Sequence, residues 1–133
     1  MFKLDDRLAA DTVEVTRWPL SRVLLMNDAT FPWLVLVPER PGLRDLDDLD
    51  AADHQTVMAE ITRASRALKE TCQPDKINVA ALGNVVEQLH IHIIARFRHD
   101  PAWPKPVWGM VPAQPYDEDA LGETLSRLKD ALG

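Results

Sequence analysis

Cysteine is almost absent from this chain, which has a single one, Cys72, among 133 residues. A lone cysteine excludes an internal disulfide framework and a metal centre built from a cysteine cluster. Long apolar runs are missing too, since the densest, residues 33–37, ends at Pro38, far short of the length that spans a membrane. The opening residues, MFKLDDRLAADT, carry acids early and do not resemble a signal peptide. We therefore expect a cytoplasmic protein without a membrane partner.

An excess of positive charge is also missing. The chain has 15 lysines and arginines against 21 aspartates and glutamates, for a formal net charge of −6. Proteins that bind DNA or RNA usually present a broad basic face, so we expect no nucleic-acid partner. A small phosphorylated ligand is still possible, because a few local donors can hold a phosphate whatever the net charge.

The first part of the chain is typical of β-structure. The length fits one domain, residues 1–133, large enough to bury a core. Residues 12–18, 21–26 and 33–37 have the composition of strands, and the turn-forming NDATFP between the last two predicts a hairpin. The continuous apolar character of residues 33–37 predicts burial on both faces.

The second part predicts a long helix and two further strands. Acidic residues 45–50 suit the first turn of a helix, and apolar residues then recur at helical spacing until Pro74. Strands are expected at residues 77–82 and 89–97, and an amphipathic helix at residues 117–132. The sequence thus predicts an α+β fold: a five-stranded, mainly antiparallel sheet with one long helix across it and a C-terminal helix.

The stretch QLHIHIIAR, residues 88–96, alternates between polar and aliphatic side chains. In a strand, Gln88, His90 and His92 would line one face, about 7 Å apart along the strand. We expect this to be an exposed face, with the aliphatic residues buried beneath the long helix. Three interpretations remain open: solvated histidines, a metal-ligand pair, or a row of groups that binds one ligand and includes a nucleophile.

The same stretch resembles the signature of the histidine triad (HIT) family, in which three histidines alternate with hydrophobic residues on one strand. Gln88 stands in the place of the first histidine. Asn27-Asp28 after a strand, WLVLVPERP, the long helix and Gly83-Asn84 follow in the family's order, so the resemblance covers about residues 20–97. It implies a HIT-like fold and a nucleotide hydrolase or nucleotidyl transferase. Such an enzyme acts at the α-phosphate of nucleoside phosphoramidates, phosphoesters or dinucleoside polyphosphates.

The resemblance also implies roles for particular residues. His90 would attack the phosphorus and form a covalent nucleotidyl-histidine intermediate, and His92 would contact the phosphate and leaving-group oxygens. Gln88, at the first triad position, can form hydrogen bonds but cannot carry a proton. The resemblance gives six residues to substrate binding: Asn78 and Asn84 to the phosphate, Asn27 and Asp28 to the ribose hydroxyls, and Leu25 and Met26 to the base pocket.

Further expectations concern Trp33, the tail, cofactors and assembly. Near Trp33 the family pattern has a small residue or a glycine followed by histidine, and we take this position to be non-catalytic. Trp103 and Trp108, in a proline-rich tail, are expected to pack over the site, to form a subunit contact or to anchor the loop. We expect no cofactor, no resident metal and a homodimer formed through the long helix and the strand at residues 77–82. The alternatives are a nucleotide-binding module with little or no turnover, and a metal-binding protein that uses His90 and His92.

Overall fold

The computed structural model describes all 133 residues and contains a five-stranded sheet with the strand order β1-β2-β3-β5-β4. All neighbouring strands are antiparallel. The strands are β1 (Thr12–Arg17), β2 (Ser21–Met26), β3 (Trp33–Pro38), β4 (Lys76–Ala80) and β5 (Ile91–Arg96). The predicted fold class is confirmed, and each predicted strand lies within a few residues of its expected position.

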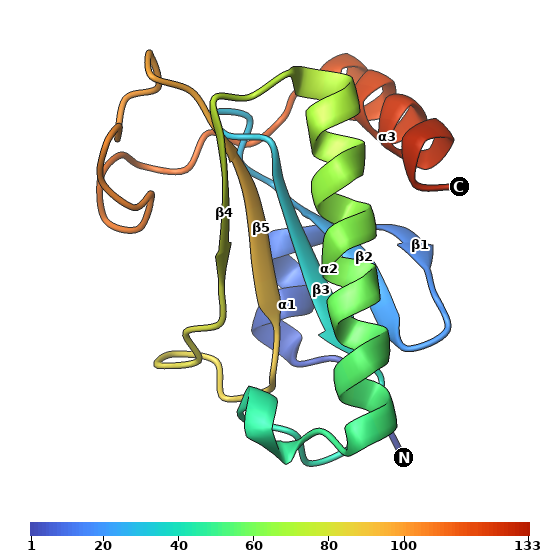
Figure 1. Cartoon of the computed structure of the whole chain (residues 1–133). Coiled ribbons are helices and arrows are strands. Elements are labelled where there is room, and N and C mark those ends of the chain that lie inside the picture. Colours follow the sequence, from blue (N-terminus) through green and yellow to red (C-terminus); the bar gives the residue numbers. More distant parts are fainter.

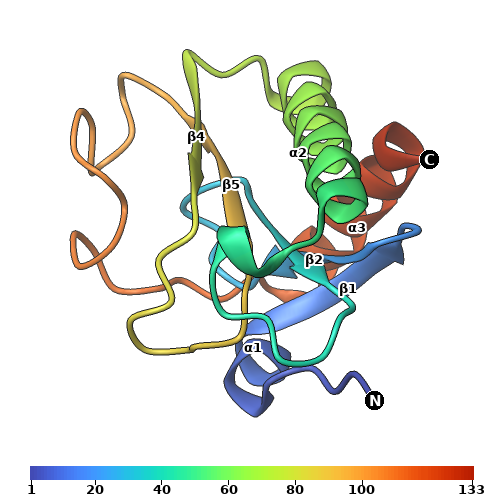
Figure 2. The ribbon, with the colours of Figure 1, turned by 60° about the horizontal axis from the view of Figure 1, so that its bottom comes forward.

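Helices cover both faces of the sheet (Figures 1 and 2). The long helix α2 (Ala51–Cys72) and the C-terminal helix α3 (Glu118–Leu132) lie on one face, and the short helix α1 (Asp6–Asp11) lies on the other. Asp50 caps α2 by accepting a hydrogen bond from the Asp53 amide, and Asp117 caps α3 in the same way. Of the acidic residues 45–50, Asp50 alone begins α2 as its cap, because residues 45–48 form a separate 3-10 turn, η1 (Leu46–Asp48). None of the helices combines the length and the hydropathy of a membrane-spanning segment.

The alternation of the strands divides the core in two. Leu34 and Leu36 of β3, together with Ile91 and Ile93 of β5, are buried under α2 and α3. Trp33, Val35 and Val37 are buried on the opposite face, with Ile94. The prediction that β3 is buried on both faces is therefore confirmed. The second core also contains residues from outside the sheet: Leu8, Phe31, Ala102 and Val107.

Helix α1 was not predicted from the sequence. Its six residues are too few to show a helical period, and Leu8 is its one buried residue. The carboxylate of Asp5 starts the helix by accepting hydrogen bonds from the amides of Arg7 and Leu8. Because α1 lies on the face opposite α2, it helps to cover the side of β5 on which the histidines lie.

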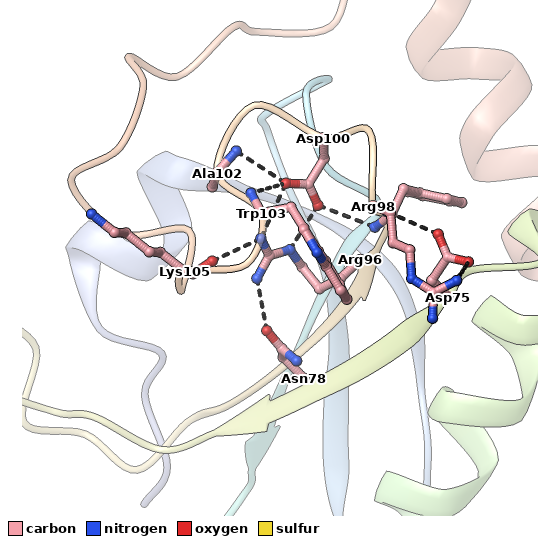
Figure 3. Close-up of polar contacts among 9 residues, drawn as sticks. Asp75, Asn78, Arg96, Arg98, Asp100, Ala102, Trp103 and Lys105 are labelled. Atoms are coloured by element: carbon pink, nitrogen blue, oxygen red, sulfur yellow. Dashed lines mark hydrogen bonds and ion pairs between the residues drawn. The ribbon is translucent and has the colours of Figure 1, made fainter.

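A buried arginine fixes the tail that follows β5 (Figure 3). Arg96 is 1% exposed, and its Nε and Nη2 lie 2.8 and 3.1 Å from the carboxylate oxygens of Asp100. It also donates to the Asn78 side chain in β4 and to the main-chain carbonyl of Lys105, each at 2.8 Å. Asp100 in turn accepts from three main-chain amides of the turn: Phe97, Ala102 and Trp103. The tail is thereby attached to β4 and β5 just before it reaches residues 107 and 108.

The carboxylate of Asp100 is ionised throughout the neutral range. Burial raises its pKa, but the hydrogen bonds from Arg96 and from the three amides lower the pKa by more than burial raises it. The result is a pKa of about 2. The buried guanidinium therefore always faces a negative partner.

We expect Asp100→Asn to destabilise the protein by about 3–5 kcal/mol, because it leaves the buried charge of Arg96 without its partner. Urea unfolding at neutral pH measures the change. Arg98→Gln is the matched control, since it removes an exposed ion pair with Asp75 at 3.8 Å and should cost under about 1 kcal/mol. Equal losses in the two variants would contradict this account of the tail.

Candidate active site

His90 and His92 lie next to each other on the sheet face opposite α2. Their ring centroids are 4.9 Å apart, and the rings are inclined at 74°. The alternation predicted this shared face correctly, but the expectation that the face is exposed was wrong. His90 is 7% exposed and His92 is 4% exposed, because α1 and the C-terminal tail cover this side of the sheet. The interpretation of the pair as solvated histidines is excluded for the same reason.

The orientation of His90 is set by the main chain directly before β5. Its Nδ1 lies 2.7 Å from the main-chain carbonyl oxygen of Gln88. A carbonyl can only accept a hydrogen bond, so Nδ1 carries the proton and Nε2 of the neutral ring keeps its lone pair. The ring is therefore held with a nucleophilic nitrogen away from the main chain.

His92 is held in the opposite tautomer. The indole Nε1 of Trp33, on the neighbouring strand β3, lies 3.0 Å from Nδ1 of His92. An indole N–H can only donate, so Nδ1 of His92 accepts and the proton of the neutral ring is on Nε2. Burial, and then the charge of His90, lower the pKa of His92 to about 4. At neutral pH this side chain is an uncharged hydrogen-bond donor.

The two tail tryptophans have different roles. Trp108 packs over the site, with its ring centroid 5.0 Å from that of His92 and 5.7 Å from that of Trp33. Trp103 anchors the loop instead, beside the guanidinium of Arg96. The aromatic wall around His92 thus comes from β3 and from the tail.

A cavity of about 550 Å³ opens onto both histidines. We call it the histidine cavity. Asn84, Met26 and Trp108 line it, together with Arg7 and Asp11 of α1. A second cavity of about 470 Å³, which we call the tail cavity, shares four lining residues with it: Asp11, Met26, Trp33 and Trp108. The two cavities therefore adjoin and offer room for a ligand longer than one ring.

Four of the six residues expected to bind substrate line these cavities. Asn84 and Met26 line the histidine cavity, and Asn27 and Asp28 line the tail cavity. Asn27 accepts a hydrogen bond from the amide of Tyr116, and Oδ1 of Asp28 accepts from the amides of Thr30 and Gln114. The Oδ2 atom of Asp28 and the side-chain Nδ2 of Asn27 form no hydrogen bond within the protein, which leaves an acceptor and a donor at this cavity.

The other two, Leu25 and Asn78, lie outside the site. Leu25 is 1% exposed and packs in the core under α2, because strand alternation turns it away from its neighbour Met26. The side-chain oxygen of Asn78 accepts the hydrogen bond from Arg96, and Asn78 lines neither cavity. We therefore assign no substrate contact to either residue.

Gln88 does not continue the row of histidines into the histidine cavity. It precedes β5, and its side-chain amide donates to the carbonyl of Lys3 and accepts from the amide of Asp5, each at 2.8 Å. It lines a smaller cavity of about 200 Å³ with His90. The residue in the first triad position thus fastens the N-terminal segment that leads into α1.

Sequence reasoning missed three residues of this site: Trp33, Arg7 and Asp11. Trp33 was taken to be non-catalytic, although it bonds directly to His92. Arg7 and Asp11 belong to the unpredicted helix α1, so no pattern placed them near β5. No three side chains of His, Cys, Asp or Glu come together in a way that could hold a metal ion.

Comparisons with known proteins agree with this geometry. Residues 7–99 match the model of the HIT domain family. A histidine triad protein from Bradyrhizobium japonicum is 46% identical, with a TM-score of 0.97 over 99% of this chain and 98% of that one. One from Marinobacter aquaeolei is 45% identical, with a TM-score of 0.97 over 99% and 96% of the two chains. One from Sinorhizobium meliloti is 38% identical, with a TM-score of 0.96 over 98% and 97%. No curated protein matches the chain significantly.

The lowered pKa of His92 has a consequence for stability. Below about pH 6.5 the unfolded chain takes up a proton on this ring, whereas the folded protein does so only near pH 4. We therefore expect the free energy of unfolding to fall by about 2–3 kcal/mol as the pH drops from 6.5 to 4. Well above pH 6.5 the ring is neutral in both states, and its contribution should be constant.

Urea unfolding across this pH range measures the effect. His92→Asn is the matched control, because asparagine does not titrate while its side-chain oxygen can still accept the Trp33 hydrogen bond. In the variant, the free energy of unfolding should fall less steeply between pH 6.5 and 4, because the contribution of His92 is gone. If the free energy of unfolding falls as steeply in the variant as in the wild type, groups other than His92 cause the fall.

Proposed function

The chain belongs to the HIT domain family, and from that premise we propose that it is an enzyme that acts on nucleotides through a covalent nucleotidyl-histidine intermediate on His90. Its substrates would be nucleoside phosphoramidates, phosphoesters or dinucleoside polyphosphates, cleaved at the α-phosphorus. The family supplies the nucleotide-binding fold, and the proposal concerns the chemistry that this member carries out.

The observation that carries the proposal is the pair of opposite tautomers. His90 donates through Nδ1 to the carbonyl of Gln88, which leaves the lone pair of Nε2 for an electrophile. His92, 4.9 Å away between ring centroids, offers an N–H through Nε2. A nucleophile beside a hydrogen-bond donor is the arrangement that substitution at phosphorus requires.

The first step forms a bond between Nε2 of His90 and the α-phosphorus. The bond from phosphorus to the leaving group breaks, and its electron pair stays with the leaving group. The positive charge on the substituted ring is stabilised by the Nδ1–H hydrogen bond to the Gln88 carbonyl. In the second step water attacks the phosphorus, the phosphorus–nitrogen electron pair returns to His90, and the surplus proton of the water passes to solvent. His92 donates a hydrogen bond to a phosphate or leaving-group oxygen in both steps.

The two cavities support a division of the substrate. The phosphate would lie in the histidine cavity, where Asn84 is a further donor. The nucleoside would extend into the tail cavity, where Oδ2 of Asp28 and the side-chain Nδ2 of Asn27 suit the ribose hydroxyls and Met26 suits the base.

The replacement of the first histidine by Gln88 is the observation in favour of a second candidate function, a module that binds nucleotides without turnover.

We expect His90→Ala to lower turnover by about three to six orders of magnitude, as the loss of a covalent nucleophile does in other enzymes. Mass spectrometry of the wild type, quenched in base during turnover, should find one nucleoside monophosphate attached to His90. His90→Asn is a useful companion, because its amide N–H can still reach the Gln88 carbonyl while it lacks the nucleophile. If the wild type binds a nucleoside monophosphate but forms no adduct and shows no turnover, the binding module is the correct function.

We also propose a homodimer. Strand β4 is the last in the sheet order, so no strand pairs with its outer edge. Apolar side chains near it and on α2 are exposed, with Val79 at 48% and Met58 at 60%. A second copy of the chain is the commonest cover for such an edge.

Light scattering at micromolar concentration should give twice the chain mass of 15.0 kDa. Val79→Lys places a charge on β4 and should shift the protein towards the monomer. Met110→Lys changes an exposed apolar residue of the tail and should leave the mass unaltered. A wild type that scatters as a single chain would rule out the dimer.

A further inference from the structure

The hydrogen bond between Trp33 and His92 joins two buried side chains. Trp33 is 7% exposed, His92 is 4% exposed, and the two nitrogens are 3.0 Å apart. For His92 to act as an acid, both of its ring nitrogens must first carry protons. A proton on Nδ1 would point at the indole N–H, which cannot accept a hydrogen bond. The bond therefore opposes the charged form of His92 by geometry alone.

The surroundings of His92 act mostly in the same direction. Across the sheet it pairs with Val35 of β3 and Ala80 of β4, which carry no charge. The charged or titratable groups that line the same cavity are His90, Arg7 and Asp11. Two of these would repel a charged His92, and only Asp11 would attract it. The pKa of His92 is lowered first by burial and then by the charge of His90.

We propose that Trp33 is a positioning residue that keeps His92 a neutral hydrogen-bond donor, so that the site favours substrates whose leaving group departs as a stable anion. This inference rests on the proposed attack by His90. A neutral imidazole N–H is too weak an acid to protonate a leaving group within the reaction. The side chain at the first triad position, Gln88, carries no proton to transfer and is engaged with Lys3 and Asp5.

The favoured chemical class is therefore a phosphoric anhydride or an aryl ester. When a phosphate or a phenolate leaves, the electron pair of the broken phosphorus–oxygen bond stays on an oxygen that holds it well, and no proton moves in that step. An alkyl amine or an alkoxide needs a proton from the site in order to leave. Arg7, which makes no ion pair within the protein, adds a positive charge to the cavity in which an anionic leaving group would depart.

The role of Trp33 can be tested without any substrate. Nitrogen-15 NMR of the imidazole rings should show, in the wild type between pH 6 and 8, an unprotonated Nδ1 and a protonated Nε2 on His92. Trp33→Phe keeps a ring but removes the donor, and should shift the Nδ1 signal and raise the pKa of His92. Trp108→Phe is the matched control, because Trp108 touches the same ring but donates no hydrogen bond to it. A protonated Nδ1 in the wild type, or no difference between wild type and Trp33→Phe, would overturn the assignment.

The leaving-group preference is tested with aryl esters of one nucleoside monophosphate made from phenols of increasing pKa. Wild-type rates should fall steeply with phenol pKa, and an alkyl phosphoramidate should react at least ~100-fold more slowly than a phosphoric anhydride, since acid catalysis is worth at least that factor. In Trp33→Phe, the rate at acid pH should depend less steeply on the phenol pKa. A wild-type rate that does not change with the phenol pKa, or the same dependence in both proteins, would overturn the preference. A wild type that cleaves no ester would overturn the proposed function and the preference with it, whereas the NMR result would still decide the role of Trp33.

Discussion

The two-residue period of β5 is the constraint on which the site depends. This strand, with His90 directly before it, must fill the core under α2 and also present imidazoles on the other face. Ile91 and Ile93 meet the first demand, and His90 and His92 meet the second. Because both faces are covered, the imidazoles are buried, and each buried ring nitrogen without a partner would cost about 1–3 kcal/mol. The partners that satisfy these nitrogens therefore determine the chemistry.

Those partners come from different places in the fold. The carbonyl of Gln88 fixes His90 from the same chain segment, and the indole of Trp33 fixes His92 from the adjacent strand. The side chain of Gln88 holds the N-terminal segment, so one residue orients the proposed nucleophile and also secures α1 over it. On the other side, the bridge between Arg96 and Asp100 holds the tail that brings Trp108 to the site. Polar side chains thus attach both covers of the site: the half-buried Gln88 attaches α1, and the buried Arg96 attaches the tail.

The sequence predicted the regular parts well, because their information is local. Strand alternation and the helical stripe placed all five strands and both long helices, and the QLHIHIIAR pattern led to the right family. Leu25 was assigned to the base pocket together with its neighbour Met26. Neighbouring residues of a strand point to opposite faces, and Leu25 points into the core under α2. Other features depend on contacts between distant segments, which no local period encodes. They are the burial of the histidines, the hydrogen bond from Trp33 to His92 and the hydrogen bond from Arg96 to Asn78.

The central claim is that Nε2 of His90 faces the phosphorus of a bound nucleotide. A crystal structure of the protein with a nucleoside monophosphate tests it most directly. The account predicts the phosphorus in the histidine cavity at about 3–3.5 Å from Nε2 of His90, the near-attack distance, with the ribose towards Asp28. A phosphate bound away from His90, or one that meets only His92, would contradict it.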